Sequence, residues 1–167
     1  RPHNRAVLES ICGLCLLGFG VYALGQASAA VAGAVPAGLR MILDANIPKE
    51  DLSSLVAIRT GAAPLDFEVT KEFMERYNLP VLQNYGATEF SGAVAGWALK
   101  DFHQFWDKKP GSVGRFQPGV KGRVIDPDTG EEKALGEEGV LEMKAAQFGL
   151  GDAWLRTTDR AIIDTDG

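Results

Sequence analysis

The feature that most constrains the fold is a strand, a helix and a second strand within residues 55–83. Residues 55–59 form a short run rich in branched side chains that stops at Gly61, and residues 80–83 form a second run. Between them a helix opening at Pro64 keeps its apolar residues on one face: Val69, Phe73 and Tyr77. A βαβ unit pairs its strands in parallel. The sequence therefore predicts an α/β fold with a parallel sheet.

Two glycine-containing loops follow these strands, at residues 60–64 and 84–89. Loops that follow parallel strands meet at one edge of the sheet, so we expect these two to be neighbours. In the second loop the Tyr85 ring can stack on a base and the Thr88 hydroxyl can donate to a phosphate, while Glu89 is a hard oxygen ligand for Mg²⁺. Two tight turns with a surface glutamate, and no ligand, would account for the same residues equally well.

The charge balance narrows the class of ligand. The chain has 167 residues, a net charge of −5 and a pI near 5.1. A non-specific nucleic-acid binder would show clustered Lys and Arg, so we expect no nucleic-acid partner. A small anionic ligand remains compatible, because a few local donors or one Mg²⁺ can outweigh an acidic average.

The N-terminal part contains an uncharged run from Ser10 to Leu39 that is long enough to span a bilayer. Its glycines, with Pro36, divide it into short apolar pieces, so we favour a buried helix and strand over a membrane segment. Cys12 and Cys15 have C-x-x-C spacing within this run, without the second pair that zinc requires. We therefore interpret them as small core residues.

The pattern changes after Asp107 to short strands and tight turns. Residues 120–126 and 140–144 alternate partly with period two and are joined through a turn at 127–130, and residues 160–164 form a third strand. We therefore expect an α/β lobe and a small β lobe: residues 1–106 and residues 107–167. Before this change, His103, Phe105 and Trp106 are typical of an aromatic cluster that caps the sheet. Four acidic residues are typical of a solvated face: Glu131, Glu132, Glu137 and Glu138.

Five segments resemble motifs of the adenylate-forming superfamily, which contains acyl-CoA and aryl-CoA ligases, peptide-synthetase adenylation domains and beetle luciferases. Residues 85–89, YGATE, resemble its Y-G-x-T-E motif. The other matches follow the order of the family: DLSSL and TGAAPL within 51–65, PGSVGR at 110–115, the hairpin within 126–141, and WLRTTD at 154–159. The resemblance covers residues 35–167. It implies the later part of a large N-terminal domain, in which a small distorted β-barrel lobe follows the α/β lobe.

The resemblance also implies a role for each matched residue. Thr88 would bind the α-phosphate and Glu89 the Mg²⁺, which makes both catalytic candidates. Asp159 would accept hydrogen bonds from the two ribose hydroxyls, as a carboxylate can do at once. Gly86 belongs to the same nucleotide-binding motif and would also wall the acyl pocket. The adenine would be held by the following residues, with Tyr85 against its face: Gly61, Ala62, Ala63, Pro64, Asn84 and Tyr85.

One position departs from the family pattern, because Thr158 replaces the glycine that usually precedes the ribose aspartate. If that position needs a positive φ, a β-branched residue would be strained there. Two parts of the family are also missing from the sequence: the phosphate loop, which would precede Arg1, and the C-terminal domain with its catalytic lysine. We therefore expect a fragment that binds nucleotide weakly and turns over little on its own.

The function that the resemblance implies is activation of a fatty or other carboxylic acid by ATP and Mg²⁺, followed by transfer of the acyl group to coenzyme A. We expect such a protein to be cytoplasmic and its partners to be small molecules: the carboxylate, ATP and coenzyme A. Two alternatives stay open. One is an amino-acid-activating adenylation domain, and the other is a non-catalytic module that binds only a nucleotide or a partner.

Overall fold

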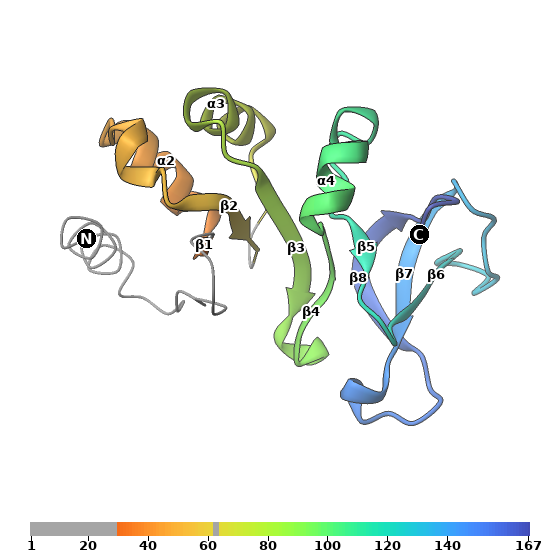
Figure 1. Cartoon of the computed structure of the whole chain (residues 1–167). Coiled ribbons are helices and arrows are strands. Elements are labelled where there is room, and N and C mark those ends of the chain that lie inside the picture. The colour runs from red at the N-terminus through yellow and green to blue at the C-terminus, as the bar shows by residue number, and fades with distance from the viewer. Residues whose placement is uncertain (1–29, 62–63) are drawn as a thin grey trace. The chain divides into compact units, whose positions relative to one another are not determined.

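The computed structural model describes residues 30–61 and 64–167, which form two compact units (Figure 1). The first unit contains the described residues up to Asn84 together with Trp97–Val113. The second contains Tyr85–Gly96 and Gly114–Gly167. The C-x-x-C pair and most of the uncharged run lie outside the described residues, as do Ala62 and Ala63.

Parallel strands form the centre of the first unit. β1 (Ala30–Ala34) pairs with β2 (Leu55–Thr60), and β2 pairs in parallel with the start of β3 (Val81–Ala87). The register places Ile58 opposite Val81 and Thr60 opposite Gln83. Both predicted strands and their parallel pairing are therefore confirmed, as is the α/β class.

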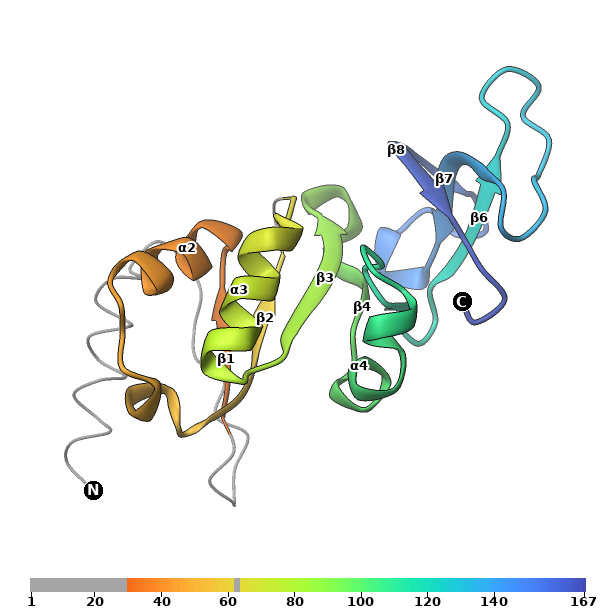
Figure 2. The same cartoon turned by 90° about the horizontal axis from the view of Figure 1, so that it is seen from above.

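Two helices cover one face of these strands. α2 (Pro36–Asp44) and α3 (Phe67–Tyr77) lie beside each other over β1 and β2 in both views (Figure 2), and the short 3₁₀ helix η1 (Lys49–Leu52) precedes β2. Leu39 from α2 packs with Phe73 from α3 and with Ile58, and all three are almost fully buried. The predicted apolar face of α3 is confirmed, because its three members are buried: Val69, Phe73 and Tyr77.

The start of α3 differs from the prediction. The helix begins at Phe67, not at Pro64, and Asp66 is its N-cap. The Asp66 carboxylate accepts hydrogen bonds from the backbone N–H groups of Glu68 (2.9 Å) and Val69 (3.1 Å). A side-chain acceptor that satisfies two otherwise unpaired N–H groups sets the helix start more strongly than a proline upstream.

An aromatic cluster packs against the neighbouring strand residues Ala57 and Leu82. It is built by Trp97, by Phe102 of α4 (Leu99–Phe105) and by Trp106 of the following 3₁₀ helix η3 (Trp106–Lys108). Phe102 and Trp106 stack with ring centroids 4.8 Å apart. Adjacent strand residues point to opposite faces of a sheet, so this cluster covers the face opposite α2 and α3. The predicted capping cluster is confirmed for Phe105 and Trp106, whereas His103 is exposed and the buried members are Trp97 and Phe102.

The second unit is built from antiparallel strands. β4 (Gly92–Gly96) pairs with β5 (Arg115–Phe116). A separate sheet has the order β6 (Lys121–Ile125), β7 (Glu138–Lys144) and β8 (Leu155–Ile162). A small antiparallel sheet after the α/β part of the chain is therefore confirmed. Its third strand is longer than predicted and begins at Leu155, because β7 continues far enough to pair Met143 with Leu155.

The turn between β6 and β7 follows the prediction. The Asp126 carboxylate accepts from the backbone N–H groups of Thr129 (3.1 Å) and Asp128 (2.9 Å), which lowers the pKa of that carboxyl. Gly130 takes a φ of 74°, which a glycine adopts without steric cost. An Asx-type turn therefore closes this hairpin.

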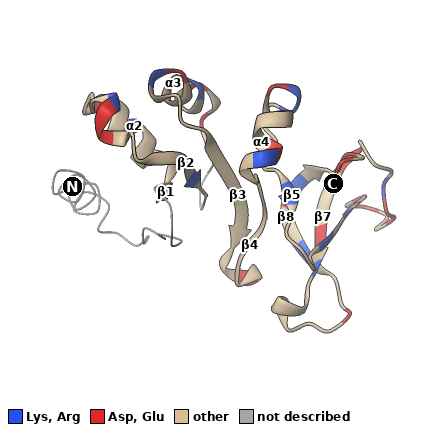
Figure 3. Ribbon diagram, in the orientation of Figure 1, with Lys and Arg blue, Asp and Glu red and all other residues tan. Residues whose placement is uncertain are grey.

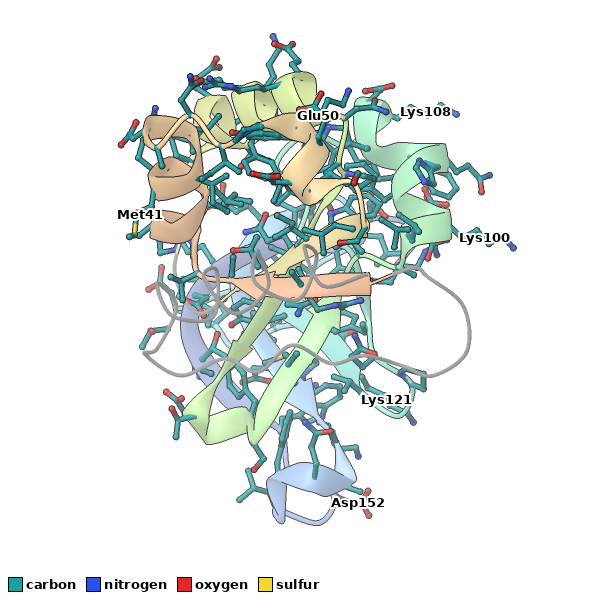
Figure 4. The ribbon with its side chains drawn as sticks, turned by 60° about the vertical axis from the view of Figure 1, so that its left-hand side comes forward. Met41, Glu50, Lys100, Lys108, Lys121 and Asp152 are labelled. Atoms are coloured by element: carbon teal, nitrogen blue, oxygen red, sulfur yellow. The ribbon has the colours of Figure 1, made fainter. Side chains whose placement is uncertain are left out.

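Figure 3 shows charged residues on helices, strands and loops, whereas the segments β3 and β4 carry none. Figure 4 shows Met41 pointing outward from α2, and Lys100 and Lys108 pointing outward from the α4 region. Among the described residues one charged side chain is buried: Glu142 is only 8% exposed and accepts two hydrogen bonds from Arg123, at 2.9 and 2.7 Å. Pairing of this kind offsets the cost of removing a carboxylate from water.

The four glutamates expected on a solvated face are all exposed. Glu138 accepts a hydrogen bond from Arg160, and Glu132 lies 3.6 Å from Arg123. Within residues 30–61 and 64–167, no helix combines the length and apolar character needed to cross a membrane.

Replacing Asp66 tests the assignment of the α3 N-cap. Asp66→Ala should lower the free energy of unfolding by about 1 kcal/mol, because two helix N–H groups lose their acceptor. Asp66→Asn, which keeps a capping oxygen, should lose less. Urea unfolding followed by circular dichroism measures both, and equal stability of Asp66→Ala and the wild type would contradict the assignment.

Candidate functional site

The first unit places two of the predicted site residues side by side. Gly61 follows β2 and Asn84 lies on β3, and a Cβ added at Gly61 would come within 3.2 Å of the Asn84 carbonyl oxygen. The prediction that the two segments are neighbours is therefore confirmed for Gly61 and Asn84. Pro64 is exposed.

Arg59 is a residue of this region that the sequence reasoning did not single out. Its guanidinium donates to the Asn84 Oδ1 atom at 2.9 Å, which fixes the orientation of the Asn84 side chain. The signal was present in the sequence, since Arg59 is the one charged residue in the apolar β2 segment. Next to it the Thr60 hydroxyl is buried without a hydrogen-bond partner among the described residues.

The second unit places the Y-G-x-T-E motif differently from the prediction. Tyr85, Gly86 and Ala87 belong to β3 and not to a loop, and Thr88 and Glu89 begin the 3₁₀ helix η2 (Thr88–Phe90). Tyr85 and Gly86 are half-buried, whereas Thr88 and Glu89 are exposed. The strand continues through the motif because its aromatic ring has a core to pack on: the Tyr85 ring lies 5.7 Å from the buried ring of Phe90.

Gly86 allows two backbone segments of the second unit to approach closely. A Cβ at this position would lie 2.4 Å from the Gly92 carbonyl oxygen and 2.7 Å from the Ala93 Cα atom. Both are backbone atoms, which cannot rotate away as the end of a side chain can. A glycine is therefore required at the turn from β3 through η2 to β4.

Tyr85 and Asp159 are 74 residues apart in sequence, and the second unit brings them into contact. The Tyr85 hydroxyl donates a hydrogen bond to Oδ2 of the Asp159 carboxylate. Burial raises the pKa of the Tyr85 phenol well above its ordinary value, and the adjacent Asp159 carboxylate raises it further. The phenol therefore stays protonated, and so remains a donor, across the physiological pH range.

The backbone around Asp159 is irregular. In the pairing of β7 with β8, Val140 lies opposite Arg160 and Glu142 opposite Arg156, so Leu141 alone lies opposite residues 157–159. The Thr157 hydroxyl donates to the Leu141 carbonyl at 2.9 Å and accepts from the Asp159 N–H at 3.1 Å. These two hydrogen bonds replace part of the backbone hydrogen bonding that is interrupted between β7 and β8. Bulges of this kind re-aim side chains beside functional sites.

Thr158 lies in β8 and does not have the positive φ that would strain a β-branched residue. Three non-glycine residues in the described chain do have a positive φ: Asn46, Asn78 and Ser91. The replacement of the family's glycine by Thr158 therefore costs no backbone strain, because an extended strand accommodates a β-branched residue well.

The comparison with protein families is consistent with this geometry. The model of a family described as AMP-binding enzyme matches residues 22–151, which is most of the chain. The chain therefore belongs to the AMP-binding enzyme family, and the resemblance to the adenylate-forming superfamily is confirmed.

Known relatives support the CoA ligase branch of the family. The chain is 35% identical over 136 residues to 4-coumarate--CoA ligase-like 8 of Arabidopsis thaliana, a match covering 74% of this chain and 24% of the relative. It is 34% identical over 122 residues to the luciferin 4-monooxygenase of Photinus pyralis, covering 72% and 21%. The structure of ATP-bound MatB from Rhodopseudomonas palustris superposes with a TM-score of 0.69 at 28% identity, covering 82% and 29%. The chain thus spans less than a third of the length of each of these proteins.

Substitution of Gly86 tests the close approach of the two backbones. Gly86→Ala should lower the free energy of unfolding by about 1–3 kcal/mol, the usual cost of forcing extra volume into a packed region. Gly33→Ala on β1 is the matched control, because the added Cβ would meet nothing within 4 Å. Chemical denaturation measures both variants, and equal stability of the two would show that the turn can relax.

Proposed function

We propose that this chain contributes the nucleotide-binding region of an enzyme that activates a carboxylic acid with ATP and passes the acyl group to coenzyme A. The observation that carries the proposal is the contact between Tyr85 and Asp159. These residues come from two separate motifs of the resemblance, Y-G-x-T-E and W-x-x-T-G-D, and meet through a direct hydrogen bond. The relatives named as CoA ligases support the thiol acceptor.

The chemistry assigned to the whole protein has two steps. A carboxylate oxygen attacks the α-phosphorus of ATP, forming an acyl-adenylate as the bond to pyrophosphate breaks. A thiolate then attacks the acyl carbon, a thioester forms, and AMP leaves with the electron pair of the broken C–O bond. Activation replaces oxide, a very poor leaving group, with AMP.

In this proposal the residues of the second unit act on the nucleotide. Tyr85 lies against the adenine face, Thr88 donates to the α-phosphate, and Asp159 accepts from the ribose hydroxyls. Gly61, Asn84 and Pro64 are assigned to the adenine by the resemblance to the family. Ala62 and Ala63, which lie outside the described residues, have the same assignment from the resemblance. Gly86 has no side chain and so leaves room where the acyl group would lie.

Mg²⁺ fits the donor set at Glu89. The carboxylate is exposed, and the described residues contain no cluster of three or more His, Cys, Asp or Glu side chains that could form an all-protein cage. Mg²⁺ in nucleotide enzymes typically takes one or two carboxylates, with phosphate oxygens and waters completing the octahedron. When bound, the ion would neutralise charge that builds up on the phosphates.

Several finer points remain part of the proposal. The lobes at residues 1–106 and 107–167 would be subdivisions of the family's N-terminal domain, and a fatty or other acyl acid in the cytoplasm would be the substrate. An amino-acid-activating adenylation domain would use the same nucleotide residues but would need an acidic residue for the substrate ammonium group. A partner-binding module would need neither Thr88 nor Glu89.

A nucleotide titration distinguishes the enzyme from the partner module. Calorimetry with AMP and with Mg·ATP should show binding to the wild-type chain, weakened about tenfold or more in Thr88→Ala because a hydrogen bond to a charged phosphate is lost. Glu89→Ala should reduce the dependence of ATP binding on Mg²⁺.

Glu131→Ala is the matched control for Glu89→Ala, because it removes another exposed glutamate from the same unit. It should bind both nucleotides like the wild type. Identical affinities in all four proteins would contradict the proposed roles and favour the partner module.

A further inference from the structure

We propose that the hydroxyls of Tyr85 and Thr157 are positioning groups that hold the Asp159 carboxylate ready to bind the cis-diol of a ribose. The inference rests on the proposed function, since it takes Asp159 as the ribose-binding residue. It goes further in two respects. Tyr85 receives a second role besides stacking on the adenine. Thr157 receives a role that the resemblance to the family does not give it.

The carboxylate needs such support because of where it lies. Asp159 is exposed, on a strand whose regular pairing with β7 is interrupted at Leu141. An exposed carboxylate on irregular backbone samples several rotamers, and a ligand must then order it at an entropic cost. A group that orders Asp159 beforehand removes that cost from binding.

Two hydroxyls, those of Thr157 and Tyr85, supply this order from different sides. The Thr157 hydroxyl bridges the Asp159 N–H, at 3.1 Å, and the Leu141 carbonyl, at 2.9 Å, and so fixes the backbone at the bulge. The Tyr85 hydroxyl fixes the carboxylate end through Oδ2. Tyr85 is itself held because its ring packs with Phe90 in the core cluster of the second unit.

The bond to Tyr85 does not exhaust the acceptor capacity of Asp159. An ionised carboxylate offers roughly four lone-pair sites, and one phenol donor uses one of them. The remaining sites can accept from both hydroxyls of a diol while the tyrosine bond stays in place. Tyr85 keeps donating its hydrogen bond to Asp159, because its phenol stays protonated.

The test compares AMP with 2′,3′-dideoxy-AMP, which lacks the diol. The wild-type chain should prefer AMP, and Asp159→Asn should lose most of that preference. Tyr85→Phe keeps the ring and removes the hydroxyl, and it should reduce the preference by about two- to tenfold, the range expected for ordering one side chain. Thr157→Val should reduce it in the same direction. A purely structural role would instead weaken both nucleotides equally.

Tyr77→Phe is the matched control, because it also removes a tyrosine hydroxyl, one that donates to the Ile42 carbonyl in the first unit. It should keep the wild-type preference. Thermal unfolding identifies any variant that fails to fold. If Tyr85→Phe does not fold, the preference of Thr157→Val for AMP over 2′,3′-dideoxy-AMP tests the inference.

The outcomes separate this inference from the proposed function. If Tyr85→Phe retains the wild-type preference while Asp159→Asn loses it, the ribose role stands and the positioning role is overturned. Tighter binding of AMP to Tyr85→Phe would also overturn it, since the bond would then compete with the ligand. A wild-type chain that binds neither nucleotide, or both equally, would overturn the ribose role of Asp159 itself.

Discussion

The parallel pairing of β2 with β3 is the constraint on which the first unit and its predicted site residues depend. Parallel strands end at the same edge of a sheet, so the pairing of Thr60 with Gln83 puts the next residues of each strand, Gly61 and Asn84, beside each other. A shift of one residue would turn each side chain of β3 to the other face. The shift is opposed because both faces are buried, with Val81 in one core cluster and Leu82 in the other.

In the second unit, apolar packing fixes the backbone and polar side chains are placed upon it. The core cluster contains Phe90, Leu141 and Met143, and the Tyr85 ring packs at its margin with the hydroxyl directed to Asp159. Because a β-bulge interrupts the β7–β8 ladder at Leu141, the backbone there is completed by a side chain, Thr157. An apolar core and an irregular strand together bring two distant motifs into contact.

Much of the first unit could be predicted from sequence because its signals are local. The four-residue recurrence of Val69, Phe73 and Tyr77 and the apolar runs on either side follow directly from helix and strand geometry. The predicted start of α3 at Pro64 was wrong because Asp66 caps the helix, so that the helix begins at Phe67. Of the loop predicted at residues 84–89, the part 84–87 was wrong because glycine and polar residues favour turns locally, whereas the packing of Tyr85 on Phe90 extends the strand.

The contact between Tyr85 and Asp159 could not be derived from the sequence spacing, since it depends on how β3 and β8 fold within one unit. Only the family resemblance assigned both residues to the same nucleotide. The roles of Arg59 and of the motif residue Thr157 were missed for the same reason, because they depend on partners distant in sequence or on a bulge. Neither residue type is distinctive by itself.

The most direct test of the account is carboxylate-dependent release of pyrophosphate from ATP by the full-length protein that contains this chain. The assay would use a panel of acids from acetate to long-chain and aromatic acids, with and without coenzyme A. The account predicts release that requires a particular acid and turns over repeatedly only when coenzyme A is present. Absence of release with every acid, from a protein that binds ATP, would contradict it and favour a module that binds nucleotide without catalysis.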